Sequence, residues 1–318
     1  MSLGQVFRET ERERLEEFPA LLVKSELLTK RDLKLAIQQL PHRPAGASES
    51  ATELVKYLVD AGFLTAWQCG RLLRGMYRGF LFDGLKLVDH LGHGSKTSIY
   101  AAEQPIVRRR ISVVIFAPAI TADRAAVSLI EKRLRIISSL DHPAILGIHH
   151  AGWFEGNFYY TRPYVDGCNL MQFASASGPL PCALAAAIGL QIIWIADYMS
   201  KRGHFLSVKP ESVLIDTNGR VRVGGTGLTR ESVGGHKRGF EDSPPEWDAS
   251  GLAAVLHLLV AGAEEGQAGD AGLTAILNTR DSDGLAELIR GLVPFEGSRT
   301  WTLDGARRVL TEAVRRPI

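Results

Sequence analysis

The sequence predicts an α+β protein in which a small helical module precedes a strand-rich region and then a mainly helical region. Residues 25–37 and 61–73 repeat a helix-turn-helix pattern at an offset of 36 residues. Residues 85–116 contain short runs of apolar and polar side chains, which are typical of strands. Residues 183–201 and 248–262 are long apolar runs, which are typical of buried helices. Together these patterns favour one helical module followed by a larger mixed domain.

Length and composition fit a protein with a substantial core and no dominant charge. The chain has 318 residues, which suits two domains or a two-lobed fold with an extension. Its hydrophobic fraction is 45% and its formal net charge is +2, so no global field favours nucleic acid or anionic lipid. Cys69, Cys168 and Cys182 lie far apart and form no Cys-x-x-Cys pair. We therefore expect a reduced setting without a disulfide framework.

Targeting signals are not evident in the sequence. The first 20 residues are highly charged and lack the apolar segment of a signal peptide. We find no run of about 18–20 uncharged apolar residues, so we expect no membrane span. His149-His150 has no third ligand spaced nearby, so no metal site is expected there. The expectation is a soluble, cytoplasmic protein.

The helical module is predicted to cover residues 1–81. Residues 1–17 form a charged amphipathic helix candidate, and residues 41–50 read as a Pro/Gly/Ser loop between the two repeats. Thr29 and Thr65 precede the second helix of each repeat and are suited to act as N-caps. Helix-turn-helix units can bind DNA, but these second helices present residues that a core needs. Those residues are Leu33, Ile37, Trp67 and Leu72.

Strands and helices alternate after the module. Residues 85–91 lead into a glycine-containing turn with Gly92 and Gly94, and a further strand falls within residues 102–116. Residues 124–140 have apolar side chains at helical spacing. Residues 157–166 read as another strand.

One stretch, residues 203–230, organises the second half of the chain. It contains Lys209-Pro210, and Gly225 follows Ser207 at an interval of 18 positions. With Pro245-Glu246 and the apolar helix that follows, this spacing resembles the catalytic and metal-binding loops of eukaryote-like (Hanks-type) bacterial Ser/Thr protein kinases. The resemblance implies a bilobal protein-kinase-like fold over residues 82–318, with a β-rich N-lobe and a helical C-lobe.

The resemblance also assigns positions, and most of them hold an altered residue. Val114 replaces the phosphate-binding lysine and Arg133 replaces its glutamate partner. Ser207 replaces the catalytic aspartate, while Ser212 and Gly225 replace the two metal ligands. Four more positions concern the nucleotide cleft. They are Gly92, Gly94 and Thr97 of the glycine-rich loop and Arg162 at the gatekeeper.

These substitutions lead us to expect a pseudokinase that is not an enzyme and binds no cofactor or metal, because phosphoryl transfer depends on charge neutralisation and positioning. The retained Lys209 alone does not supply that chemistry. We expect a protein-interaction or regulatory scaffold whose partner is an active kinase or another signalling protein, without nucleic acid. The alternative is an unusual Ser/Thr kinase, or a metal-independent nucleotide-binding protein, that uses Lys96 or Lys209.

Two structural expectations accompany this interpretation. Glu246 and Arg299 are predicted to form a buried ion pair, and only Trp247 separates Glu246 from Asp248, so the usual peptide-substrate platform is expected to be missing. Tyr77 and Phe80 are expected either to serve as exposed partner anchors or to pack the module against the N-lobe.

Overall fold

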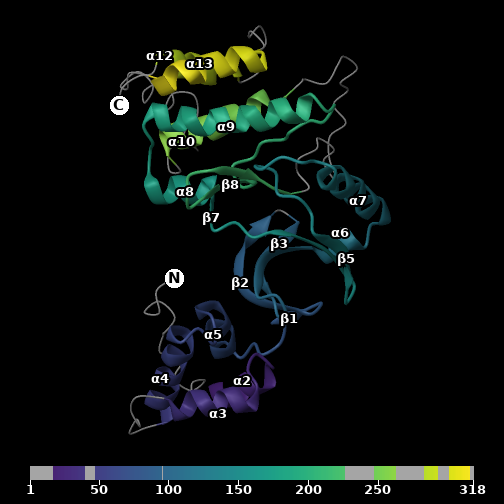
Figure 1. Ribbon diagram of the computed structural model, residues 1–318, viewed down its shortest axis with the longest axis vertical. Helices are drawn as coiled ribbons and strands as arrows, with labels where there is room; N and C mark the ends of the chain where they lie inside the picture. Colours follow the sequence, from purple (N-terminus) through teal and green to yellow (C-terminus); the bar gives the residue numbers. More distant parts are fainter. Residues whose placement is uncertain are drawn as a thin grey trace. The chain divides into compact units, whose positions relative to one another are not determined.

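The computed structural model describes residues 17–39, 47–94, 96–225, 247–262, 283–292 and 301–315 (Figure 1). The chain divides into two compact units, and each is considered separately below. Unit 1 comprises residues 1–122 and 150–164, and unit 2 comprises residues 123–149 and 165–318.

Four helices open unit 1 and reproduce the predicted repeat. They are α2 (Phe18–Lys24), α3 (Lys30–Gln38), α4 (Ala47–Asp60) and α5 (Ala66–Leu73). Thr29 caps α3 by accepting a hydrogen bond from the Asp32 N–H at 3.1 Å, and Thr65 caps α5 by accepting from the Gln68 N–H at 3.2 Å. Both predicted N-caps are therefore confirmed.

One helix boundary in the module differs from the prediction. Helix α4 begins at Ala47, so the last part of the predicted loop 41–50 is helical. Residues 47–50 are alanine, serine and glutamate, and no proline follows them within the helix, so a helix can start at Ala47. The helix candidate at residues 1–17 lies outside the described residues except for Glu17.

Phe80 is a core residue of unit 1. It is only 1% exposed and meets the Trp67 ring edge-to-face at a centroid distance of 5.9 Å. Tyr77 is partly buried against the same cluster, which also contains Phe18, Leu22 and Leu58. The expectation that Phe80 could be an exposed partner anchor is therefore wrong, because the helical module needs this ring to complete its core.

A six-stranded antiparallel sheet forms the rest of unit 1, in the order β1-β2-β3-β4-β6-β5. Its strands are β1 (Leu81–Phe82), β2 (Leu85–Gly94), β3 (Thr97–Gln104), β4 (Arg109–Phe116), β5 (His150–Phe154) and β6 (Asn157–Pro163). Helix α6 (Pro118–Thr121) follows β4. Strands β3 and β4 are joined by a turn, so residues 102–116 span the end of one strand and all of the next.

Helix α5 packs on one face of this sheet through side chains that reach backbone carbonyls. Thr65 Oγ1 donates to the Val88 oxygen at 2.5 Å, and Gln68 Nε2 donates to the Leu87 oxygen at 2.7 Å. Trp67 packs against the apolar cluster of this face, and its ring lies 6.0 Å from that of Tyr100. The module and the sheet therefore belong to one compact unit, and the domain boundary between residues 81 and 82 stays a prediction.

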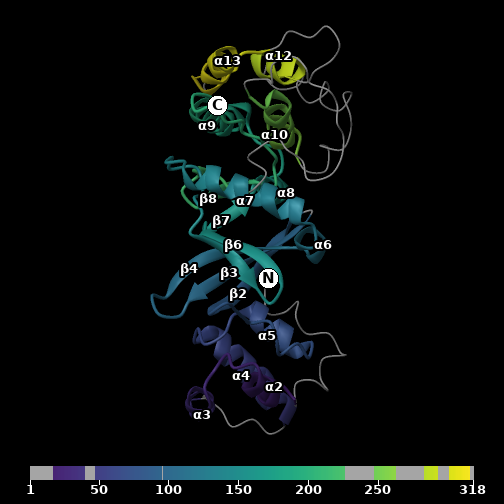
Figure 2. The same cartoon turned by 90° about the vertical axis from the view of Figure 1, so that its right-hand side faces the viewer.

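Unit 2 is mainly helical (Figure 2). Its helices are α7 (Arg124–Ser138), α8 (Leu170–Ser177), α9 (Cys182–Ser200), α10 (Ala249–Ala261), α12 (Asp283–Leu292) and α13 (Leu303–Arg315). A small sheet contains β7 (Gly167–Asn169), β8 (Val213–Asp216) and β9 (Val221–Val223) in that order.

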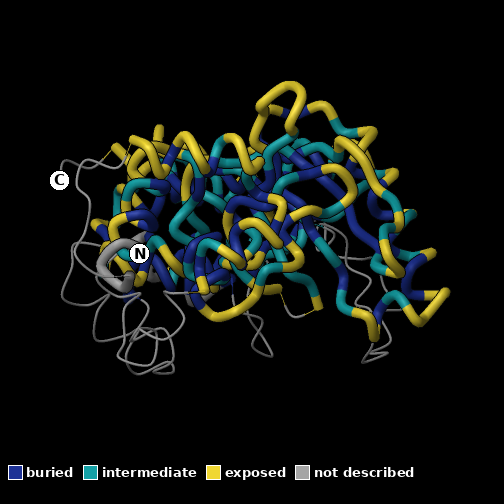
Figure 3. Tube along the Cα trace, turned by 90° about the horizontal axis from the view of Figure 1, so that it is seen from below, coloured by how far each residue is buried: buried dark blue, intermediate teal, exposed yellow. Residues whose placement is uncertain are grey.

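Helix α9 is the central core helix of unit 2, and α10 and α13 both pack against it. Figure 3 shows the buried stretches in dark blue. By length and composition alone, α9 is the one helix among the described residues that could cross a membrane, although half of its apolar window is buried inside the protein. Such burial is also what the core helix of a globular domain shows.

Candidate functional site

The glycine-containing turn is a tight β-hairpin between β2 and β3. Gly94 pairs with Thr97 across the turn, and Gly92 has a φ of 145°, which favours glycine. A Cβ on Gly94 would lie 2.5 Å from Thr97 Oγ1, so a larger residue would force that hydroxyl to move. Hairpin geometry alone therefore accounts for both glycines.

Several predicted positions meet on one face of the unit 1 sheet. Val114 lies directly opposite Ile99 and Tyr160, and Ser112 lies opposite Ala101 and Arg162. Residues directly opposite each other in an antiparallel sheet share a face. Val114 is only 2% exposed, so the predicted lysine position holds a buried aliphatic side chain without charge.

Arg162 brings a charge to this face. It is 6% exposed, and its Nε has no hydrogen-bond partner among the described residues. A guanidinium cannot lose its proton in a protein, so its burial carries a desolvation cost that a bound anion would reduce. The predicted gatekeeper position therefore holds a large, buried cationic side chain.

In unit 2 the loop that resembles the catalytic loop is held in place by Asp248. The carboxylate accepts a hydrogen bond from the Val208 N–H at 2.9 Å and also caps α10 through the Gly251 N–H at 2.9 Å. A Cβ on Gly251 would lie 2.4 Å from the Val208 oxygen, so glycine permits this close approach. Leu206 and Val208 are buried on either side of Ser207.

The side chains at the remaining loop positions are used locally or are exposed. Ser212 Oγ donates to the Lys209 carbonyl at 2.9 Å, which closes a turn within the loop. Lys209 is exposed and Ser207 is half-buried. Gly225 has a φ of 125°. The two residues after it lie outside the described part, as do both members of the predicted ion pair Glu246–Arg299.

Asp216, at the end of β8 after this loop, already has hydrogen-bond and ion-pair partners. Its Oδ1 accepts from the N–H groups of Asn218 and Arg220 at 2.9 Å, and its Oδ2 lies 3.3 Å from Arg222. Burial raises the pKa of this carboxyl, but the hydrogen bonds and Arg222 outweigh burial and leave the pKa below its ordinary value. Among the described residues, no group of three or more His, Cys, Asp or Glu side chains is placed to bind a metal.

Arg133 lies on the buried face of α7, beside Ile130 and Leu134. Glu131, the acidic residue nearest to it in sequence, lies on the outer face, where it meets Arg135 at 3.4 Å. The helix therefore separates these side chains, as their spacing predicts.

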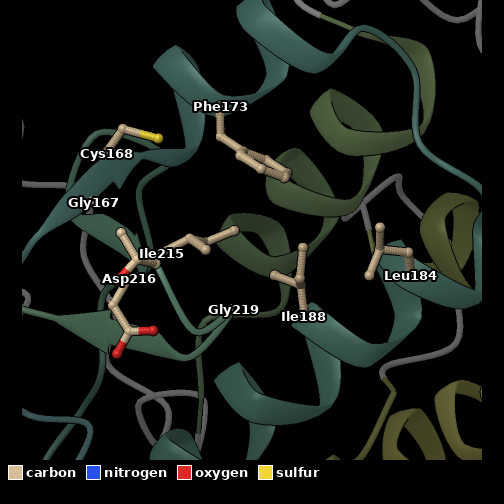
Figure 4. A pocket seen from close by; sticks show the side chains of 9 residues that line it. Gly167, Cys168, Phe173, Leu184, Ile188, Ile215, Asp216 and Gly219 are labelled. Atoms are coloured by element: carbon tan, nitrogen blue, oxygen red, sulfur yellow. The ribbon is translucent and has the colours of Figure 1, made fainter.

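A cavity of about 380 Å³ lies within unit 2, where β7, β8, α8 and α9 approach one another (Figure 4). Phe173, Leu184, Ile188 and Ile215 surround it, and the Cys168 thiol lies at its edge. Burial raises the pKa of that thiol. No pattern in the sequence predicts this cavity, because its apolar lining residues have the pattern of an ordinary core.

Comparison with solved structures identifies the fold. The kinase domain of PknI from Mycobacterium tuberculosis matches with a TM-score of 0.57 and 21% identity, over 74% of this chain and 98% of the solved domain. The chain has a protein-kinase fold. The bilobal fold expected from the motif spacing is thus confirmed.

Sequence comparison also finds protein kinases among the similar proteins. PrkC of Bacillus subtilis, a serine/threonine-protein kinase, is 27% identical over 214 residues, which are 65% of this chain and 30% of PrkC. The probable kinase PknB of Lactococcus lactis is 25% identical over 150 residues, which are 46% of this chain and 24% of PknB. The chain thus spans less than a third of either relative. No family model matches the chain.

These relatives correct one expectation. The prediction that the chain is not an enzyme is contradicted, because the relatives are named as serine/threonine-protein kinases and the matched structures are kinase domains. The inference failed because it judged activity from side-chain identity at a few aligned positions. Phosphoryl transfer depends on positioned charge, and such charge can come from other groups.

Proposed function

We propose that this protein is a signalling protein of the kinase fold and that recognition of another protein is a main task of its kinase-like domain. The observation that carries the proposal is a contrast between the shape and the charge of residues 206–225 in unit 2. Asp248 fixes the loop at Val208, while Ser212 and Gly225 occupy the two metal positions. The backbone of this region is held in place while the charged groups expected there are replaced. This combination supports recognition of another protein by the folded surface, whatever phosphoryl transfer the domain retains.

The partner we propose is an active kinase or another signalling protein. Relatives named as protein kinases act on proteins, so a protein surface is the natural ligand class for this fold. The helical module of unit 1 enlarges the surface available for such contacts.

Affinity capture of the full chain from its native cell extract tests this proposal. We expect a stoichiometric protein partner on the parent chain and on Lys132→Met, a change of one exposed lysine on α7. We expect weaker capture with Asp248→Ala, which releases the loop at Val208. No partner above background, together with phosphoryl transfer in a radiolabel assay, would contradict the proposal.

A second candidate is an unusual Ser/Thr kinase or a metal-independent nucleotide-binding protein that uses Lys96 or Lys209. The names of the relatives favour it, and Lys209 is an exposed cation on the anchored loop. Saturation with nucleotide at 100 times its Kd would stabilise the protein by about 2.7 kcal/mol. Melting with ATP, with and without Mg²⁺, measures this effect.

Three lysine variants separate the groups involved. If this candidate holds, Lys96→Met or Lys209→Met abolishes the ATP-dependent rise in melting temperature and the transfer of radiolabel, whereas Lys132→Met preserves both. An equal response of all three variants would exclude a specific role for either lysine.

A further inference from the structure

The hairpin that joins β3 and β4 ends in an apolar tip. The turn covers residues 105–108, and Ile106 is 97% exposed, the highest value among the large apolar side chains of the described residues. Val107 beside it is 64% exposed. A single exposed aliphatic residue is common on protein surfaces. Two in succession at the apex of a turn form a small projecting apolar surface.

Three consecutive arginines, Arg108, Arg109 and Arg110, follow this tip. All three are exposed, and the ion pairs found among the described residues do not involve them. Arg109 and Arg110 begin β4, so their side chains leave the hairpin on opposite faces. The only acidic residue of this hairpin stem is Glu103, which pairs with Arg110 in register. Cationic groups therefore surround the base of an apolar apex.

A partner of this hairpin can be bound only through side chains, because both strands of the hairpin are already paired with neighbouring strands. The Arg108 N–H donates to the Gln104 oxygen at 2.8 Å and closes the turn. Strands β3 and β4 are both interior strands of the sheet, so neither offers a free edge to a partner strand. A partner must therefore accept two aliphatic side chains and, behind them, several guanidinium groups.

We propose that this hairpin tip, residues 105–110, docks on a bilayer surface that contains anionic phospholipids. Ile106 and Val107 enter the boundary between head groups and acyl chains, and the arginines contact the lipid phosphates. A projecting tip suits a soft surface, which needs no preformed pocket. Protein hot spots favour Trp and Tyr over aliphatic residues, and this tip has no aromatic side chain. The inference does not depend on the proposed partner or on nucleotide binding.

The contact is expected to be weak and reversible. Stable membrane anchoring usually takes two membrane-binding signals. The apolar tip and its arginines together count as one such signal. Each arginine lost near an anionic surface reduces binding about fivefold. Loss of both exposed aliphatic side chains reduces it at least about tenfold.

Co-sedimentation of the full chain with vesicles tests the proposal. We compare vesicles of phosphatidylcholine alone with vesicles of phosphatidylcholine and phosphatidylserine. The parent chain is expected to bind only the second kind, and less at high salt. Ile106→Ser with Val107→Ser is expected to lose at least about tenfold in binding, and Arg109→Gln with Arg110→Gln about 25-fold.

A matched charge control is Arg31→Gln with Lys34→Gln, which removes the same charge from an exposed position on α3. This control is expected to bind like the parent, and unchanged melting temperatures confirm that all variants fold. Failure of the parent to bind either vesicle overturns the proposal, as does an equal loss in both charge variants. A photo-crosslinker at position 107 that captures a protein and no lipid, with extract and vesicles both present, also overturns it.

Discussion

At the scale of single residues, burial lowers the reactivity of two cysteine thiols by raising their pKa. Cys69 is almost fully buried, and burial raises its pKa from 9.0 to about 12. Cys168 is half-buried at the edge of the unit 2 cavity, and burial raises its pKa as well. The thiolate is the reactive form, so both residues should react slowly with alkylating reagents.

We predict that iodoacetamide at pH 8 leaves Cys69 unmodified in the folded chain and modifies Cys168 more slowly than a small-molecule thiol. Well below its pKa, the thiolate fraction and hence the rate rise about tenfold per pH unit. Mass spectrometry of the labelled peptides measures the two rates. The chain in urea is the control, and labelling of Cys69 at the same rate in both states would contradict the prediction.

Asp248 is the residue on which the loop of unit 2 depends. Asp248→Ala removes the cap of α10 and the hydrogen bond to the Val208 N–H. We expect a loss of about 2–4 kcal/mol in the free energy of unfolding, from the cap and a charge-assisted hydrogen bond together. Urea unfolding followed by circular dichroism measures it.

Ser250→Ala is the matched control for this change. It removes only an exposed hydroxyl that donates to Asp248 at 3.1 Å, and we expect an effect below about 0.5 kcal/mol. Equal stability of both variants would show that Asp248 does not fix the loop.

At the scale of elements, helix α5 shows that a capping glutamine can also bind a neighbouring strand. Gln68 and Gln172 occupy the same position in two capping boxes, at the start of α5 and of α8. Gln172 is exposed. Gln68 is buried and also donates to the Leu87 carbonyl in β2. Only the first of these two helices is joined to a strand in this way.

This difference predicts unequal costs for the same substitution. Gln68→Ala leaves a buried carbonyl unpaired and should cost about 1–3 kcal/mol, whereas Gln172→Ala should cost about 0.5–1 kcal/mol. Thermal unfolding of both variants measures the difference. Indistinguishable melting temperatures would mean that the bond to β2 contributes nothing to the stability of unit 1.

The helices and strands of both units could be predicted better from the sequence than the contacts between them. Thr29 and Thr65 marked two helix starts because their hydroxyls have a fixed local partner three residues later. The bond from Gln68 to Leu87 could not be foreseen, because a backbone carbonyl has no signature in the sequence. The same reason hid the cavity around Ile188, whose lining comes from four separate elements.

At the scale of the whole molecule, motif spacing predicted the fold because loop and helix lengths survive changes in side chains. The interval between Ser207 and Gly225 predicted the kinase fold although neither residue is the acid expected there, and the fold was confirmed. Activity does not follow from that interval. The predicted site residues are also shared between the two units, with Val114 and Arg162 in the first and Ser207 and Ser212 in the second.

The helical module and the sheet of unit 1 should respond together to the loss of one side chain. Trp67 packs against the clusters of both, contacts the Phe80 and Tyr100 rings and lies beneath the Arg71 guanidinium at 5.3 Å. Trp67→Ala removes these contacts, and for a partly buried tryptophan we expect a loss of about 3 kcal/mol, the lower end for such truncations. Trp153→Ala, at a half-exposed tryptophan on β5, is the control and should cost about 1 kcal/mol.

Hydrogen exchange followed by mass spectrometry locates the effect of Trp67→Ala. Exchange should rise both in the helices of residues 18–73 and in strands β2 to β4, because the two parts share one core, and should stay unchanged in α9 and α10. Faster exchange confined to α5 would show that the sheet holds its structure without the module. In that case the boundary predicted between residues 81 and 82 would also separate two independently stable domains, since each part would keep its own protection.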